Sequence, residues 1–263
     1  MNISTAKKAS SRVETVVNSS WEIQQWGSNN LYPVEIQRII AASDTGISCL
    51  GRYIDFITGD GFLNEAFAEK SLNRRGDTAD DIYSLVCHDM GFWSGIALHV
   101  NYNLMGKIDE IFHVPFENCR LGTTDDSGYM AKIAVFPDWE GKKKYGKKTL
   151  KPSPDTIEYI DVFNPNPVVV QQQIALAGGI ENYKGQILWV SSAGKTTYPV
   201  AKYDAAIPYL SAEEGLGNIT CRNIRNGFYP AGMLVVKKGQ NTPMPINPDT
   251  GVAYTTDEAI IAG

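Results

Sequence analysis

The feature that most constrains the fold is a change in the spacing of apolar residues at Gly95. Before Gly95, apolar side chains recur every three to four residues, which is the spacing of amphipathic helices. After it, they alternate with polar side chains, as strands with one buried face do. Helices followed by strands predict the α+β class, with an antiparallel sheet inserted between helical blocks.

The first block is predicted to contain successive amphipathic helices. Pro33 lies in the first turn of the first helix, where its fixed φ is already helical. The second helix begins near Asp44 and stops at Gly59–Gly61, and the third runs over 77–93 after a capping box. We expect the first two to form a helical hairpin. The residues expected to be buried are Val34, Ile36, Ile39, Ile40, Ile47, Leu50, Ile54, Ile57, Ile82, Leu85, Val86 and Met90.

Short strands are predicted after Gly95, and the first two form a hairpin around a turn at 103–106. Asn166 and Pro167 then begin a helix that Gly178 ends. The expected strands are residues 96–102, 107–114, 116–121, 129–136 and 156–163.

The stretch that follows is predicted to contain a strand, a kinked helix pair and a return strand. The strand is residues 186–191, and Pro208 ends or kinks the next helix because it lacks an N–H. A capping box begins a second helix over 211–226, and Gly227 stops it. The return strand is expected at 233–236.

Composition excludes several classes of protein. Of 263 residues, 43% are hydrophobic and 20% are charged, which is ordinary for a globular protein. No run approaches the roughly 18 apolar residues of a membrane span, and the N-terminus lacks an apolar signal core, so we expect a cytoplasmic protein. The net charge of −5 argues against tight non-specific DNA binding. The cysteines at 49, 87, 119 and 221 form no CxxC pair and are expected to be reduced and mostly buried.

A search for chemistry finds no complete motif. Residues 192–196 resemble the end of a phosphate-binding loop, but Trp189 stands where the first glycine is needed. His99 and His113 have the same parity on the two hairpin strands. With Cys119 in the next strand they are either a zinc site or ordinary hydrogen-bonded histidines. No hydrolase signature appears. We therefore expect no catalytic residue, metal or cofactor.

Two basic segments have two interpretations each. Like charges repel in the lysine-rich segment, so it is expected to be an exposed loop. It is either a solvated tip or a surface that transiently contacts DNA phosphates, and the arginines of the late helix have the same alternatives. The candidate DNA-contact residues are Lys142, Lys143, Lys144, Lys147, Lys148, Arg222 and Arg225.

Several short motifs follow one another in a distinctive order along the chain. Together they resemble the portal proteins of tailed bacteriophages, as encoded by phages and prophages of Bacteroides-like hosts. The motifs are Trp26-Gly27 with Asn29 or Asn30 and Tyr32-Pro33, then Gly59–Phe62, Gly91–Gly95, Asn101–Asn103, Val114-Pro115, Cys119–Leu121, Tyr198-Pro199, Tyr203–Ala206 and Asn226–Pro230.

The resemblance implies a structural protein and no enzyme. Portal proteins form a ring of about twelve copies at one capsid vertex. Double-stranded DNA is packaged and ejected through this ring, which docks the terminase large subunit, the head-tail adaptor and capsid proteins. The protein would then be located in the virion, and in the host cytoplasm during assembly. The alternatives are a head-tail adaptor without a channel, or a hydrolase or transferase whose site leaves no motif.

The resemblance also implies an organisation of the chain. Residues 1–20 are expected to be a flexible arm, and residues 21–180 to form a wing-like α+β domain. Residues 181–238 would form a stem- and clip-like segment, and residues 239–263 would begin a further, truncated segment.

Overall fold

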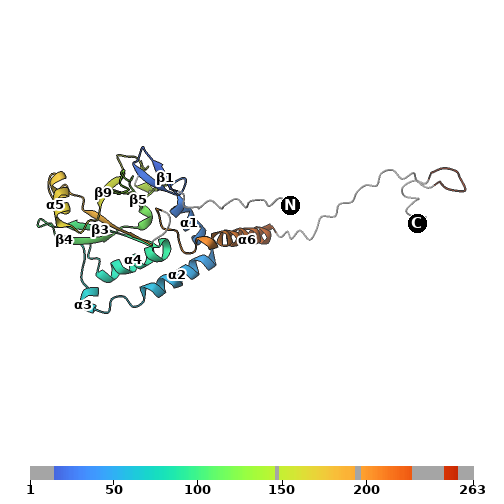
Figure 1. Cartoon of the computed structure of the whole chain (residues 1–263). Coiled ribbons are helices and arrows are strands. Elements are labelled where there is room, and N and C mark those ends of the chain that lie inside the picture. The colour runs from blue at the N-terminus through green and yellow to red at the C-terminus, as the bar shows by residue number, and fades with distance from the viewer. Residues whose placement is uncertain (1–14, 146–147, 193–196, 227–245, 254–263) are drawn as a thin grey trace, which may run out of the picture. The chain divides into compact units, whose positions relative to one another are not determined.

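The computed structural model describes residues 15–145, 148–192, 197–226 and 246–253 (Figure 1). The chain divides into two compact units, Met1–Gly217 and Asn218–Gly263. The first unit combines helices with a six-stranded sheet, so the α+β prediction is confirmed. None of the described helices is both long enough and apolar enough to cross a membrane. The expected return strand at 233–236 lies outside the described residues.

The central sheet has the strand order β4-β3-β10-β9-β6-β5. The pairs among the five strands expected after Gly95 are antiparallel, as predicted. Strand β10, which was expected in the following segment, also joins this sheet and pairs parallel with β9. The reason is α5 (Pro167–Leu176), because a helix between two strands lets the second strand run in the same direction as the first. The strands are β3 (Gly95–Tyr102), β4 (Ile108–His113), β5 (Cys119–Leu121), β6 (Lys132–Val135), β9 (Glu158–Val162) and β10 (Gln186–Ser191).

The predicted strands occur, most of them shortened at their ends. The β3–β4 hairpin around the 103–106 turn is confirmed. Residues Phe116–Asn118 form a 3₁₀ turn (η1) before β5 begins. Strand β10 lies between β3 and β9, so the expected boundary near residue 180 has no counterpart in this sheet.

Four helices precede the sheet: α1 (Tyr32–Ala41), α2 (Asp44–Thr58), α3 (Glu65–Ala68) and α4 (Ala79–Trp93). Pro33 lies in the first turn of α1, as predicted. The capping box at the start of α4 is also confirmed. The Thr78 hydroxyl accepts a bond of 3.2 Å from the Asp81 N–H, and the Thr78 N–H donates one of 2.9 Å to the Asp81 carboxylate.

Helix α2 packs mainly along α4, whereas we expected its main partner to be α1. Gly91 makes this possible, because a Cβ there would lie 2.6 Å from the Ile54 side chain. Ile47 and Leu85 are about half exposed, so their predicted burial is wrong. On α4, Cys87, Asp89 and Trp93 are buried.

The N-terminal prediction needs a correction as well. Residues Thr15–Asn18 form strand β1, which pairs antiparallel with β2 (Ile23–Trp26), so this part of the expected flexible arm is ordered. Ile23 and Trp26 are fully buried, and their burial fixes β2 beside β5. Residues 1–14 lie outside the described part of the chain.

The expected helix pair around Pro208 is one continuous helix, α6 (Ile207–Asn226), preceded by a 3₁₀ turn at Asp204–Ala206 (η2). Pro208 is the second residue of α6, where no intrahelical N–H bond is lost, so it opens the helix instead of ending it. The capping box expected at Ser211 therefore lies inside the helix. Gly227 lies outside the described residues.

Candidate functional site

An aromatic cluster centred on Trp26, here called the Trp26 cluster, brings together residues from the beginning, middle and end of the first unit. The Trp26 ring stacks on Tyr198 at 4.9 Å with an interplanar angle of 7°. It also meets Trp93 and Phe116 edge-on, at 5.7 Å and 5.6 Å, and stacks on Tyr32 at 5.8 Å. Trp26 and Tyr198 are fully buried. Such contacts stabilise beyond the area they bury.

The turn after β2 explains the first motif of the sequence. Gly27 has φ 84° and Asn30 has φ 63°, and asparagine is among the few side chains that tolerate this region. The Asn30 side-chain oxygen accepts a hydrogen bond of 3.1 Å from the Trp26 N–H. The turn therefore directs the chain from β2 into α1 while holding the Trp26 backbone in place.

Arg120 is a fully buried cation at the edge of the Trp26 cluster. Its guanidinium donates to both oxygens of Asn30, at 2.9 Å to the backbone oxygen, and to the backbone oxygens of Glu117 at 2.7 Å and Cys119 at 2.8 Å. It lies 4.9 Å from the Trp139 ring centroid. Burial lowers the pKa of Arg120 to about 10, so the group remains charged at neutral pH.

Two tyrosines of the late motifs fasten the 198–204 segment to the rest of the unit. The Tyr198 hydroxyl accepts a bond of 2.8 Å from the Leu121 N–H and donates one of 2.5 Å to the Gln24 oxygen. The Tyr203 hydroxyl donates to the Phe92 oxygen at 2.9 Å. Burial raises the pKa of both hydroxyls above the ordinary value, so they are neutral donors. These motif residues build the framework of the fold.

The two hairpin histidines do not meet. In the β3–β4 register, Leu98 pairs with His113 and His99 pairs with Phe112, so the two histidines point to opposite faces. The prediction assumed that residues of equal parity on the two strands face the same side of the sheet. Around the two histidines each even-numbered residue pairs with an odd-numbered one, so equal parity places the histidines on opposite faces. Among the described residues no group of three His, Cys, Asp or Glu side chains has the geometry to hold a metal ion.

Asp89 of α4 is a buried carboxylate that joins α4 to the sheet. It accepts hydrogen bonds from His113 Nε2 at 2.7 Å and from the Phe116 N–H at 3.0 Å, and His88 Nδ1 lies 3.5 Å away. Burial acts to raise the pKa of Asp89, but the bonds from His113 and His88 outweigh it, and the pKa lies below its ordinary value. The bond to Asp89 raises the pKa of His88. No sequence motif pointed to this cluster.

The lysine-rich segment forms a small hairpin of β7 (Lys144–Tyr145) and β8 (Lys148–Thr149), here called the lysine hairpin. The exposed loop expected there is therefore partly a pair of strands. Lys142 donates a hydrogen bond of 2.6 Å to Glu140, and Arg38 donates one of 2.5 Å to the same carboxylate. Lys142 is therefore already paired with a carboxylate of its own chain. The bond from Lys142, followed by that from Arg38, lowers the pKa of Glu140.

Lys143, which directly precedes β7, and Lys144 are exposed. Arg222 and Arg225 are exposed one helical turn apart on α6, in the part that belongs to the second unit. The structure brings Lys142, Lys143 and Lys144 together, and DNA contact by these side chains stays a prediction. The remaining candidates, Lys147 and the side chain of Lys148, lie outside the described residues, as do residues 193–196 of the phosphate-loop resemblance.

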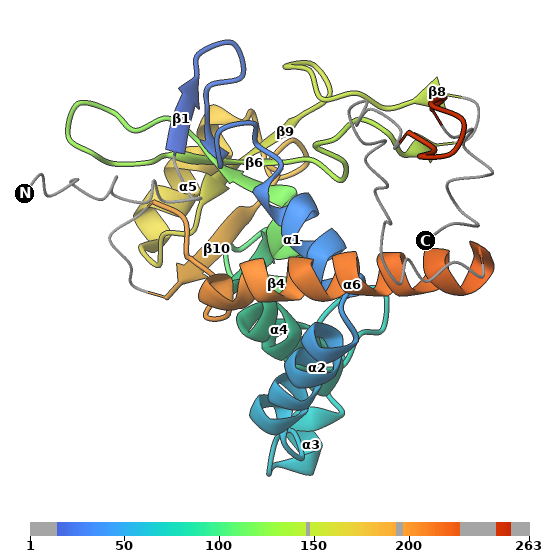
Figure 2. The same cartoon turned by 90° about the vertical axis from the view of Figure 1, so that its right-hand side faces the viewer.

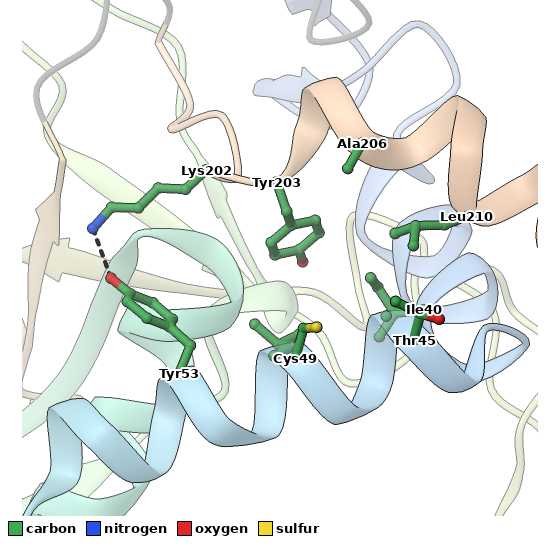
Figure 3. A pocket seen from close by; sticks show the side chains of 11 residues that line it. Ile40, Thr45, Cys49, Tyr53, Lys202, Tyr203, Ala206 and Leu210 are labelled. Atoms are coloured by element: carbon green, nitrogen blue, oxygen red, sulfur yellow. Dashed lines mark hydrogen bonds between the residues drawn. The ribbon is translucent and has the colours of Figure 1, made fainter.

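An apolar groove of about 360 Å³ lies between α2 and the segment that leads into α6 (Figure 3). Thr45, Cys49 and Tyr53 form one wall, and Tyr203 and Leu210 line the other. At one end, Lys202 donates a hydrogen bond of 2.8 Å to the Tyr53 hydroxyl. Sequence reasoning missed the groove because its walls are far apart along the chain.

The cysteine prediction holds for half of the thiols. Cys87 and Cys119 are buried, whereas Cys49 and Cys221 are exposed. Burial raises the pKa of the Cys119 thiol far above its ordinary value. The Cys119 thiol is therefore inert, since the thiolate is the reactive form.

No protein-family model matches the sequence, and no curated protein matches it either. Among solved structures, it is similar to a chain of the "Virion of native gene transfer agent (GTA) particle", with 12% identity and a TM-score of 0.46, covering 92% of this chain and 55% of that one. It is also similar to a chain of the "Neck of empty GTA particle computed with C6 symmetry" and one of the "Neck of native GTA particle computed with C12 symmetry". Each has 12% identity and a TM-score of 0.43, covering 82% of this chain and 52% or 51% of theirs. The chain thus spans about half the length of these chains.

Proposed function

We propose that this chain is a structural subunit of a phage-like particle, and specifically of the portal ring at a capsid vertex. The observation that carries the proposal is the convergence of the resembling motifs on one buried framework. For example, the Tyr32 hydroxyl donates to Asp204 at 3.0 Å across 172 positions of sequence. Motifs that are far apart in the sequence meet in one core, and independent short matches would not be expected to do so. Their convergence therefore supports a shared architecture.

The described polar clusters favour a structural role over an enzymatic one. Asp89 and His113 are bonded to each other, and Asp89 also accepts from the Phe116 N–H, so this described pair is committed to contacts within the protein. Arg120 is enclosed by protein carbonyl oxygens, so it is not poised for an anionic ligand. The proposed function relies instead on surfaces that contact other proteins and DNA.

The proposal assigns the basic side chains a transient contact with passing DNA. Lys143 and Lys144 are exposed point charges, whereas the overall net charge is −5. Weak attraction on an acidic background suits a passage, because strong phosphate contacts would hold the genome in place. Neutralising the five candidate lysines to glutamine should lower DNA packaging while particles still assemble. Unchanged packaging would remove this role for the lysine hairpin.

The role is tested by interrupting the gene in the phage or prophage that encodes it. A portal subunit is required for packaging, so induced cells should yield empty heads, and complementation should restore DNA-filled heads. Electron microscopy and nuclease-protected DNA measure the outcome. DNA-filled heads without tails would overturn the portal assignment in favour of an adaptor, and normal particles would overturn any structural role. The proposed partners make a second check, since a gene for the terminase large subunit should lie nearby.

A further inference from the structure

Aromatic and aliphatic side chains are exposed where α2, α3 and α4 meet, a surface here called the α2–α3 corner. Phe56 is 83% exposed and Leu63 is fully exposed. The Phe62 ring lies 5.0 Å from Phe67 and 4.9 Å from Tyr83, so these rings form one connected group. Exposed apolar groups that gather in this way mark a contact with another protein.

The corner carries a surplus of negative charge. The Asp80 carboxylate accepts a hydrogen bond of 3.3 Å from the Phe62 N–H, which places one carboxylate beside the aromatic group. Within residues 52–70, which contribute most of the corner, the exposed cations are Arg52 and Lys70. The exposed carboxylates of the same stretch are Asp55, Asp60, Glu65 and Glu69. A partner that fits this surface must therefore be basic.

The chain itself offers a basic projection of suitable character in the lysine hairpin. Lys144 lies in β7 of this hairpin, Lys143 directly precedes it, and both are exposed. In Figure 2, β8 lies at the upper end of the first unit and α3 at the lower end, and Figure 1 places α3 at the same end. The two surfaces are therefore on opposite ends of one unit and cannot meet within a single copy.

We propose that the lysine hairpin of one copy docks on the α2–α3 corner of a second copy. The contact is heterologous, since two unlike surfaces meet, and a heterologous contact forms a closed ring when its rotation closes. The opposite charges orient the two copies, and the exposed Phe56 and Leu63 lose water when the hairpin covers them. The inference rests on the proposed ring-forming role, and it competes with the DNA contact proposed for Lys143 and Lys144. Loss of self-association in the charge variants favours the contact between copies, whereas intact assembly with reduced packaging favours the DNA contact.

Charge exchange between two variants provides the test. One variant carries Lys143→Glu and Lys144→Glu, and the other carries Asp55→Lys and Glu69→Lys. Each variant alone presents like charges on both surfaces, so its self-association should fall roughly tenfold relative to wild type. An equimolar mixture pairs opposite charges again and should recover most of the wild-type association. Sedimentation velocity at low and high ionic strength measures each sample, and added salt should weaken wild type.

Matched controls change charge elsewhere on the same unit. Lys107→Glu and Asp126→Lys alter exposed residues outside both surfaces and should leave association at the wild-type level. If wild type associates and the charge variants associate equally well, the ring-forming role stands and this contact is wrong. Variants that each lose association without recovery in the mixture would also overturn the pairing. A wild type that stays monomeric at every concentration would overturn both this contact and the ring-forming role.

Discussion

The Trp26 cluster and the α2–α3 corner are both rich in aromatic side chains, yet they are opposites in burial. Trp26 and Tyr198 are fully buried, and the hydrogen bonds of the Tyr198 hydroxyl join segments that are far apart in the sequence. Phe56 and Leu63 are exposed to solvent, and exposed carboxylates such as Asp55, Asp60 and Glu65 lie near them in the sequence. The difference teaches that the motif residues around Trp26 hold the first unit together. The proposed partner surface instead exposes aromatic and aliphatic side chains, among which only Phe62 belongs to a resembling motif.

The largest expected effect on stability is at Arg120. Replacing it with Met removes four hydrogen bonds and leaves buried carbonyl oxygens without donors. The free energy of unfolding should fall by about 3 kcal/mol or more. Urea denaturation followed by circular dichroism measures the loss, and Arg120→Lys should recover little because an ammonium cannot reproduce the guanidinium fork.

Arg38→Ala is the matched control for this change. Arg38 is exposed and pairs with Glu140 at 2.5 Å, so its loss should cost less than about 1 kcal/mol. Equal losses for the two arginines would contradict the view that the Trp26 cluster holds the unit together.

The next effect is expected at Tyr198. Its hydroxyl bridges the Leu121 N–H and the Gln24 oxygen, so Tyr198→Phe keeps the stacked ring and removes the bridge. Leaving the buried Leu121 N–H unpaired should lower the free energy of unfolding by about 1–2 kcal/mol. Denaturant midpoints measure this change. An unchanged midpoint would show that the late motif is fastened by ring packing alone.

A smaller, pH-dependent effect is expected at Asp89. Its folded pKa lies below the ordinary 3.8, so its contribution is present above that pH and is lost as pH falls through the folded value. His88 has a folded pKa above the ordinary 6.5, so its contribution is full below that pH and is lost as pH rises through the folded value. The melting temperature should therefore be highest between these limits and fall on both sides.

Asp89→Asn should lower the melting temperature most within that window and flatten both flanks. Thermal scans from about pH 3 to pH 8 measure the profile. A variant that melts lower by the same amount at every pH would mean that Asp89 acts only through packing.

The smallest effect on stability is expected at the corner. Leu63 makes no buried contact, so Leu63→Ser should change the free energy of unfolding by no more than about 0.5 kcal/mol. The same change should weaken self-association, which light scattering against concentration measures. A large loss of stability would contradict the contrast between the two aromatic regions.

The sequence was most informative where the signal is local. The capping box at Thr78 and the position of Pro33 predicted where two helices begin, and the turn at 103–106 predicted a hairpin. Pro208 was ambiguous because a missing N–H suits both the end of one helix and the start of another. Only packing of Ile207 against the core decides between them.

Non-local features could not be predicted from the sequence. The parallel pairing of β9 with β10 depends on the crossover through α5, and the hairpin register that separates His99 from His113 depends on a single-residue offset. Burial of Arg120 runs against its residue type and is possible only because carbonyl oxygens from separate segments surround it. The apolar groove and the α2–α3 corner likewise arise from segments that only the fold brings together.

The most direct test of the ring-subunit account is native mass spectrometry, with electron microscopy, of the protein expressed from its complete gene. The account predicts a closed ring of identical copies with a central opening, which dissociates into smaller species when the two surfaces are given like charge. A monodisperse monomer at all concentrations, or a closed two-fold dimer with no opening, would contradict it.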